Sequence, residues 1–412
     1  MRNYRTLLIV SLCLALSTVN LHAGGPAFTR LFGAADSAEV SYLNPAGMTR
    51  LDGPVYSGQM ILGASLSEFE VDPSVTTTSG GDPDDPAPVI VPSFYHVRPI
   101  FGDKWRLGLA LNVPGGFGAN NGSSWAGRYY SDDFSLIFVA ATATVARRVS
   151  PWLSLGGGLS VQYSSSDSTT RVPNPMTPGD ARLEVETDGV AAGWIGSAMF
   201  EFSERTRLAV TVHSETDPEE NPEVKLKDST LPDFIVDEIN KAGEDIDSTL
   251  RTPRHVDIGL YHEWGNGWSA TLDAVWVEFS RFGLTELQIE DEDLSIPDNN
   301  FNNFWILTSG VQFPVSERTQ GRFGGVYIEE PVADEDRTFS FALDHAWGFG
   351  AGILRTRESG RKYDLNATVL RLGSAPVDTG PESALSPRGR VAGTNDSPWV
   401  VVLDFTYHWN RR

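Results

Sequence analysis

The sequence predicts an all-β fold: a fourteen-stranded antiparallel transmembrane β-barrel whose N-terminal segment lies inside the lumen. From Pro54 onward, apolar and polar residues alternate in segments of about ten residues or more, the length that a tilted membrane strand needs. The connections between these segments are alternately long and short. Before them, residues 24–53 are rich in apolar side chains but show no sustained strand alternation.

The first residues have the features of a secretory signal peptide. Arg2 and Arg5 precede an apolar run from Leu7 to Leu16, and Ala23 ends a plausible cleavage site. The only cysteine lies in that run, so the exported chain must be stabilised without disulfides. A closed barrel in a bilayer provides such stability, because its strands pair all their backbone groups. We therefore expect a signal peptide at 1–23, an N-terminal segment at 24–53 and a barrel at 54–412.

The strands are predicted from period-two alternation with one apolar face. Within residues 268–276, for example, tryptophan, alanine and leucine alternate with serine, threonine and aspartate. The count is fourteen, to within two. The predicted strands are 54–71, 88–99, 104–113, 134–149, 152–170, 181–203, 205–214, 253–264, 267–287, 303–314, 317–329, 337–356, 360–373 and 398–409.

The connections predict the type of barrel. A regular alternation of long loops and tight turns is expected of an outer-membrane barrel, whose short turns are periplasmic, and not of a soluble β-sandwich. No run after the leader reaches the roughly 18 apolar residues of a spanning helix. Residues 231–243, in the longest connection, have apolar side chains at helical spacing and predict a helix. The long connections are 72–87, 114–133, 171–180, 215–252, 288–302, 330–336 and 374–397.

The chain is strongly acidic, with a formal net charge of −22, which excludes nucleic acid as a partner. The acidic residues cluster at Asp82–Asp85, Glu215–Glu223, Asp233–Asp247 and Glu290–Asp293. Two interpretations remain open. These clusters are either solvated loops or sites that bind divalent cations at an outer-membrane surface.

Residues 24–53 carry too many apolar groups for a surface tail, so we expect them to be packed inside the barrel. The sequence Asn44-Pro45-Ala46-Gly47 interrupts the segment, because proline restricts φ and glycine tolerates positive φ. We expect Phe28 and these four residues to belong to the packed segment.

The pattern of residues 35–38 and 44–48, just after a signal peptide, resembles the N-terminal hatch of the FadL/OmpP1 (TodX-like) family. Residues 252–255, 268–282 and 344–348 are similar to further pieces of that family, in the same order. The resemblance implies an outer-membrane channel for passive uptake of long-chain fatty acids or aromatic and aliphatic hydrocarbons. It also implies that the hatch gates a pocket in the lumen.

Residues 111–130 look like the family's loop after the third strand, which helps to form an outer hydrophobic groove. The resemblance implies ligand-binding roles for Pro114, Phe117, Trp125, Arg128 and Tyr129, although an extra glycine pair before the phenylalanine departs from the family pattern. The alternative is that the aromatic residues belong to a girdle at the membrane interface. The arginine would pair either with a ligand carboxylate or with a structural partner.

In the family, cargo leaves sideways near a kinked third strand. The resemblance implies a lateral opening at Gly108, Gly115 and Gly116. Several segments, such as Phe134–Val145, are apolar on both faces, which indicates a partly apolar lumen and favours a hydrophobic cargo.

The sequence indicates no enzyme, no cofactor and no metal site. Its seven histidines lack metal-ligand spacing, and there is no nucleophile elbow or phosphate-binding loop. We expect His255, His345 and His408 to be satisfied lumen or interface residues. The alternatives are a general diffusion porin, or an outer-membrane lipid hydrolase with a Ser/His pair drawn from different strands. The expected partners are hydrophobic small molecules, outer-membrane lipid and lipopolysaccharide, and the chain is expected to be a monomer.

Overall fold

The structure is a computed structural model that describes residues 26–410 except 30–31, 85, 175–178, 221, 244–245, 290–291, 294–299 and 397. The predicted signal peptide and parts of the acidic clusters lie outside the described residues.

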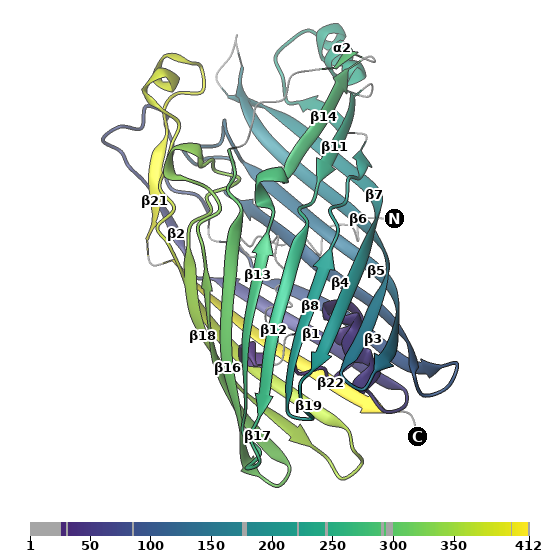
Figure 1. Cartoon of the computed structure of the whole chain (residues 1–412). Coiled ribbons are helices and arrows are strands. Elements are labelled where there is room, and N and C mark those ends of the chain that lie inside the picture. The colour runs from purple at the N-terminus through teal and green to yellow at the C-terminus, as the bar shows by residue number, and fades with distance from the viewer. Residues whose placement is uncertain are drawn as a thin grey trace.

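The described chain forms one closed antiparallel barrel of fourteen strands, as the sequence predicts (Figure 1). Each wall strand pairs with the next wall strand along the chain, and the last pairs with the first, so the wall has no free edge. The strands are β1 (Val55–Ser65), β3 (Val89–Ile100), β4 (Trp105–Asn120), β5 (Asp133–Ser150), β6 (Leu153–Pro173), β7 (Asp180–Glu201), β8 (Thr206–His213), β12 (His255–Glu263), β13 (Ser269–Val277), β16 (Phe304–Ser316), β17 (Thr319–Ile328), β18 (Ala346–Thr356), β19 (Lys362–Leu372) and β22 (Trp399–Asn410).

The connections divide the barrel into a short-turn end and a long-loop end (Figure 1). At the long-loop end, five further strands extend the sheet from the outer part of β7. The predicted helix is present as α2 (Asp233–Ala242). Among the described residues, no helix is long and apolar enough to cross a membrane. The further strands are β9 (Glu219–Glu220), β10 (Glu223–Lys227), β11 (Ile246–Arg251), β14 (Gly283–Ile289) and β15 (Glu292–Asp293).

Four predicted strand boundaries are wrong. β1 ends at Ser65, because β2 (Glu68–Val71) leaves the wall and joins β21 (Ala392–Asp396) and β20 (Val377–Asp378) in a separate sheet. The predicted strand 267–287 is divided after β13 by a single turn, η4 (Phe279–Arg281). In contrast, β4 continues beyond its predicted end at 113 as far as Asn120.

The predicted strand 337–356 begins only at Ala346. The preceding residues form a loop around Arg337, which is buried and pairs with Glu330 and Asp334. Arg337 also donates a hydrogen bond to the carbonyl of Leu343, at 3.0 Å. A buried guanidinium needs these partners, and an extended strand would carry them away from it. The ion pairs therefore outweigh the strand pattern of this stretch.

The wall alternates side chains between lipid and lumen, as strand geometry requires. Large apolar residues such as Leu159, Leu272 and Phe349 stand exposed on the outside, as expected for contact with lipid acyl chains.

On the side of the barrel formed by β13 to β22, the inner face changes from polar near the short turns to apolar near the long loops. On β22, Val400 and Val402 lie towards the long-loop end, whereas Asp404, Thr406 and His408 follow towards the short-turn end. Four other strands show the same order. Their buried polar residues near the short turns are Ser269, Thr271, Asp273, Thr308, Gln312, Arg322, Asp364, Asn366 and Thr368, and their buried apolar residues near the long loops are Val275, Val277, Phe304, Ile306, Val326, Ile328, Leu370 and Leu372.

The N-terminal segment lies within the ring of strands (Figure 1). Its first turn, η2 (Pro26–Phe28), contacts β16 to β19, while α1 (Val40–Leu43) and η3 (Pro45–Arg50) contact β4 to β7. Because these strands stand on different sides of the barrel, the segment crosses the lumen. It occupies the polar part of the inner face.

Glycines in the wall make room for this segment. A Cβ atom on Gly156 of β6 would lie 2.4 Å from the backbone nitrogen of Ala46. A Cβ on Gly108 of β4 would lie 2.4 Å from Sδ of Met48. Any larger residue at these positions pushes the segment away from the wall.

We expect Gly156→Ala to destabilise the seated segment by about 1–3 kcal/mol, because the added methyl meets backbone atoms that cannot yield locally. Denaturant unfolding of the purified barrel and trypsin cleavage at Arg50 measure the effect. The matched control is Gly58→Ala, since the nearest atom to a Cβ there is a Trp409 ring carbon at 3.7 Å. Equal stability of the two variants would contradict the prediction.

Candidate functional site: the N-terminal segment and the lumen around it

Asn44 holds the predicted turn together. The residue is fully buried, and its Nδ2 donates to the carbonyl of Phe32 at 2.9 Å. Its Oδ1 accepts from the backbone nitrogen of Gly47 at 3.3 Å, while Pro45 begins η3 and needs no hydrogen-bond acceptor for its own nitrogen. Gly47 is also required sterically, since a Cβ there would lie 2.8 Å from Cβ of Ala35.

Side chains of the wall form hydrogen bonds with the backbone of the segment. Arg207 of β8 donates to the carbonyls of Gly33 and Ala34, each at 2.7 Å. Thr144 of β5 donates to the carbonyl of Ser41 at 2.9 Å. Irregular backbone inside a barrel has few backbone partners, so the wall must supply them. This need explains why the inner face is polar at the level of the segment.

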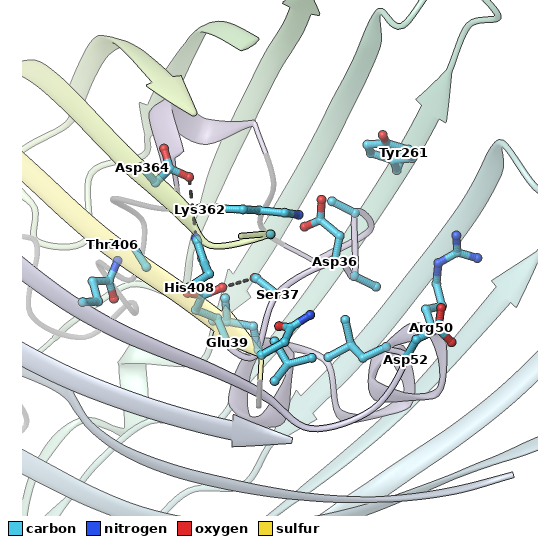
Figure 2. Close-up of a pocket in the computed structure, with 18 of the residues that line it drawn as sticks. Asp36, Ser37, Glu39, Arg50, Asp52, Tyr261, Lys362, Asp364, Thr406 and His408 are labelled. Carbon is cyan, nitrogen blue, oxygen red and sulfur yellow. Dashed lines mark hydrogen bonds and ion pairs between the residues drawn. The ribbon is translucent and has the colours of Figure 1, made fainter. Parts of the chain in front are cut away.

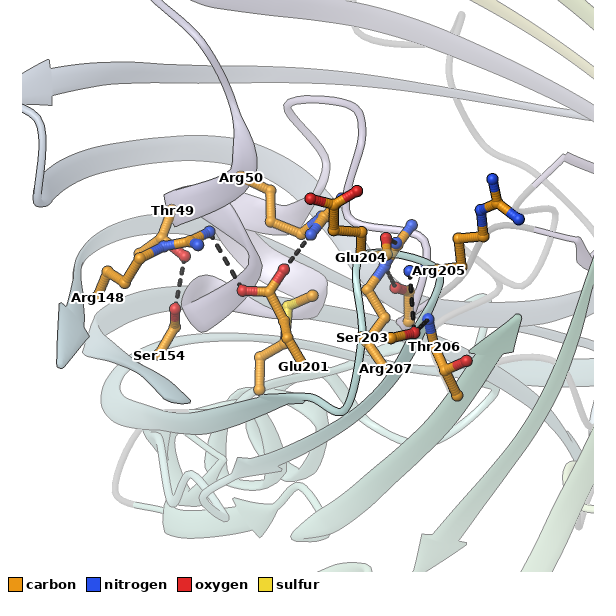
Figure 3. A network of polar contacts seen from close by, with 12 residues as sticks. Thr49, Arg50, Arg148, Ser154, Glu201, Ser203, Glu204, Arg205, Thr206 and Arg207 are labelled. Atoms are coloured by element: carbon orange, nitrogen blue, oxygen red, sulfur yellow. Dashed lines mark hydrogen bonds and ion pairs between the residues drawn. The ribbon is translucent and has the colours of Figure 1, made fainter. Parts of the chain in front are cut away.

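A second set of contacts fastens the end of the segment at the short turns (Figure 3). Arg50 pairs with Glu201 of β7, which also pairs with Arg148 of β5 at 3.2 Å. Thr49 and Ser154 of β6 share a hydrogen bond of 2.7 Å between their hydroxyl groups. Besides the apolar packing of its buried side chains, the segment is thus held by hydrogen bonds and ion pairs that can break and re-form.

A cavity of about 350 Å³ lies between the segment and the short-turn end (Figure 2). Charged side chains of both signs line it, so an apolar molecule would gain little there. The charged residues are Asp36, Glu39, Arg50, Asp52, Arg207, Glu263, Lys362 and Asp364.

Above the segment, towards the long loops, a group of aromatic rings packs together. Phe279 lies 5.0 Å from Phe301 and 5.6 Å from Phe304 between ring centroids. Phe301 in turn contacts Phe341 of the loop before β18, at 5.3 Å. Contacts of this kind add to the stabilisation from apolar burial. The outer half of the barrel therefore contains an apolar core made by the wall and the loops together.

The wall is irregular at the predicted lateral opening. Asn112 of β4 pairs with Ala140, and Gly115 pairs with Phe138, so Val113 and Pro114 stand opposite a single residue of β5. Such a bulge bends a strand and interrupts its ladder. Pro114 and Gly115 also line a cavity of about 60 Å³ inside the wall.

The structure places the other two glycines of the predicted opening differently. Gly116 follows the bulge and pairs with Ile137. Gly108 lies before the bulge in a regular ladder between Val97 and Thr144, where it faces the N-terminal segment.

Three predicted groove residues lie close together in the outer loops. Trp125 is only 2% exposed, so it does not stand in a lipid-facing girdle, and its ring packs edge-on against Phe339. Arg128 pairs with Asp180 at 2.8 Å, and the hydroxyl of Tyr129 donates to the same carboxylate at 2.8 Å. Burial and this hydrogen bond raise the pKa of Tyr129, so the phenol remains a donor. Phe117 is another of the five predicted groove residues, and its side chain lies outside the described part of the structure.

Two predicted histidines and two residues of the acidic loops pair with neighbouring side chains. His408 shares a 2.8 Å hydrogen bond with Ser57 on the inner face, and His345 lies in an outer loop beside Asp344. Of the acidic loops, Glu215 and Asp217 pair with arginines of neighbouring segments.

Sequence reasoning did not identify Arg207, Glu201 or the meeting of His213 with His255. Each residue has an ordinary place in a strand pattern, and its partners lie far away along the chain. No sequence spacing could have signalled these contacts.

Comparison with known proteins decides the family. Residues 11–374 match the model of the outer membrane protein transport proteins OMPP1/FadL/TodX. The chain belongs to this family. It is therefore a β-barrel protein of the Gram-negative outer membrane, and its short turns are periplasmic.

Relatives and solved structures agree with this membership. Outer membrane protein P1 of Haemophilus influenzae is 22% identical over 60% of this chain and 61% of its own length. The crystal structure of a Pseudomonas aeruginosa FadL homologue has a TM-score of 0.80 at 17% identity and covers 96% of this chain and 99% of its own. The Ralstonia pickettii toluene transporter TbuX has a TM-score of 0.64 at 14% identity and covers 98% and 99%.

We expect Arg207→Met to loosen the N-terminal segment, because two buried carbonyls lose a charged donor worth about 1.5–3 kcal/mol. Denaturant unfolding should show the loss, and ion conductance in planar bilayers should rise. Arg205→Met is the control, since Arg205 lies exposed in the adjacent turn. Identical conductance of the two variants would show that Arg207 does not hold the segment.

Proposed function

We propose that the protein is a passive channel through which hydrophobic molecules cross the outer membrane, with residues 24–53 as its hatch. The observation that carries this proposal is made on β13, β16, β17, β19 and β22, whose inner face is polar around the segment and apolar towards the long loops. An acyl chain gains about 0.8 kcal/mol for each buried CH₂ group, so the outer half attracts an apolar cargo. A diffusion porin would instead need a polar lumen throughout.

The segment has the properties expected of a hatch. It crosses the lumen, and Phe28, Asn44, Pro45, Ala46 and Gly47 are almost completely buried within it. Its attachment to the wall combines apolar packing of residues such as Phe28 and Met48 with hydrogen bonds and ion pairs. A shift of the segment can therefore open a route past it without unfolding the barrel.

The route below the hatch is unsuited to an apolar cargo, because charged side chains line it. The bulge at Val113 and Pro114 supports lateral exit instead, since the ladder between β4 and β5 is interrupted there. We propose that the cargo leaves through this part of the wall, between β4 and β5, and enters the membrane directly. Gly108 and Gly116 flank the proposed opening.

The cargo class that we propose is long-chain fatty acids or aromatic and aliphatic hydrocarbons. The aromatic core of the outer half fits either class, and a solved relative is named as a toluene transporter. Pro114, Phe117, Trp125, Arg128 and Tyr129 would form the outer groove once the loops part. A fatty-acid carboxylate would have to compete with Asp180 for Arg128, whereas a hydrocarbon needs no such exchange.

The proposed partners are thus hydrophobic small molecules, with outer-membrane lipid and lipopolysaccharide around the barrel. We propose a monomer, since a closed wall offers no edge strand for pairing. We assign no enzymatic activity, in keeping with a family of transport proteins.

Locking the hatch to the wall should block uptake. Thr49→Cys combined with Ser154→Cys replaces two hydroxyl groups 2.7 Å apart, on the segment and on β6. We expect oxidation to abolish most uptake of a radiolabelled fatty acid or of toluene by cells that lack other such channels, and a reductant to restore it. The control pair, Thr142→Cys with Ser160→Cys, joins two wall strands across 2.8 Å and leaves the segment free. Full uptake through the locked hatch would refute the gating role.

Deleting Pro114 tests the lateral exit. The deletion leaves one residue opposite Val139, so the ladder between β4 and β5 becomes regular. We expect uptake to fall several-fold while the barrel folds and the hatch stays seated. Pro114→Ala keeps the extra residue and should retain uptake. Unchanged uptake by the deletion variant would place the exit elsewhere.

A further inference from the structure

Three buried side chains with metal-binding chemistry meet on the inner face of the wall. His213, the last residue of β8, stands directly opposite His255, the first residue of β12, and their rings stack with centroids 4.2 Å apart. Asp257 is the next inward-facing residue of β12. All three are at least nine-tenths buried.

The polar atoms of this cluster are close together but are not hydrogen-bonded to one another. Nε2 of His213 lies 3.3 Å from Oδ2 of Asp257, and Nε2 of His255 lies 3.9 Å from the same oxygen. Neither Nε2 of His213 nor either carboxylate oxygen of Asp257 has a hydrogen-bond partner in the structure. Leaving a buried carboxylate without a partner is costly, so the cluster needs a cation or another donor.

We propose that His213, His255 and Asp257 bind a divalent first-row transition-metal ion of the Zn²⁺ type. Their ligand atoms all lie within 4.8 Å of one another. Once one imidazole turns out of the stack, so that both rings direct a nitrogen at the same point, three protein ligands with metal–ligand bonds of about 2.0–2.2 Å make a zinc site with one open position. The ion's charge would balance the carboxylate of Asp257. Two imidazoles and one carboxylate favour such an ion over Ca²⁺ or Mg²⁺, which prefer oxygen ligands.

The surroundings of the cluster fit a bound ion. The rings of His213 and His255 line the cavity of about 60 Å³, which has room for water at the open coordination position. The His255 ring also hydrogen-bonds to the backbone of Pro253. This contact orients the ring and leaves its other nitrogen as an acceptor, as in many zinc sites.

The ion would also connect the wall with the N-terminal segment. The ring of Tyr42, in α1, lies 4.9 Å from the ring of His213 between centroids. A metal ion that fixes His213 therefore fixes the surface against which Tyr42 packs, and should stabilise the seated segment. The proposal stands independently of the transported cargo, because it concerns only the wall and the segment.

Titration with ZnCl₂ tests the site. The purified barrel in detergent, stripped with a chelator, should bind one tightly held Zn²⁺ ion per chain by isothermal titration calorimetry. Zn²⁺ should also raise its midpoint of thermal unfolding, and a large excess of Mg²⁺ should not displace it. We expect His213→Gln and Asp257→Asn each to weaken binding by at least about tenfold and to lose the thermal shift.

His345→Gln is the matched control, because it removes a partly exposed imidazole from an outer loop and should bind Zn²⁺ like the unaltered protein. Co²⁺ provides a second readout: the intense visible absorption of a low-coordinate site should appear in the unaltered protein and vanish in Asp257→Asn, even if His213→Gln does not fold. The proposal is overturned if the unaltered protein binds no stoichiometric Zn²⁺. It is equally overturned if both site variants bind Zn²⁺ with unchanged affinity.

Discussion

The constraint on which the structure depends is the need to satisfy irregular backbone inside a membrane barrel. The strands of the wall pair with one another, but the N-terminal segment has only short turns and brings unpaired carbonyl and amide groups into the lumen. Arg207, Thr144, Ser197 and Thr271 supply the missing partners. The polarity of half of the inner face follows from this requirement.

The same requirement explains the contrast along the barrel axis. On the side of the barrel formed by β13 to β22, apolar residues replace polar ones where the segment ends. The aromatic core contributed by Phe279, Phe301 and Phe341 can then form against that surface. The barrel thus combines a polar surface that binds its own N-terminal segment with an apolar region above that segment. This combination is the physical basis of the proposed selectivity for hydrophobic cargo.

Attachment through polar contacts also leaves the segment able to move. A hydrogen bond adds only about 0.5–1.5 kcal/mol in net terms, and more where one partner is charged. Such contacts hold the segment in one position, but each is weak enough to break without unfolding the barrel. The bulge at Val113 and Pro114 is a second weak point, because the ladder between β4 and β5 is interrupted there. The two features lie near each other, since Tyr42, Pro114 and Gly115 line the same small cavity.

The sequence by itself determined the closed barrel, its strand count, its alternation of turns and loops, and the helix near 231–243. These properties depend on local patterns, in which period-two alternation and turn residues act over a few neighbours. It also indicated, through Asn44 to Gly47, where the irregular segment turns.

Only the tertiary structure decided which side chains meet. Arg337 converts a predicted strand into a loop through its ion pairs, and Arg128 is engaged by Asp180. His213 and His255 become neighbours solely because β8 pairs with β12 in one particular register. These contacts join residues that are distant along the chain, so no local pattern encodes them. Their free energy depends on burial and distance, which exist only after the wall has closed.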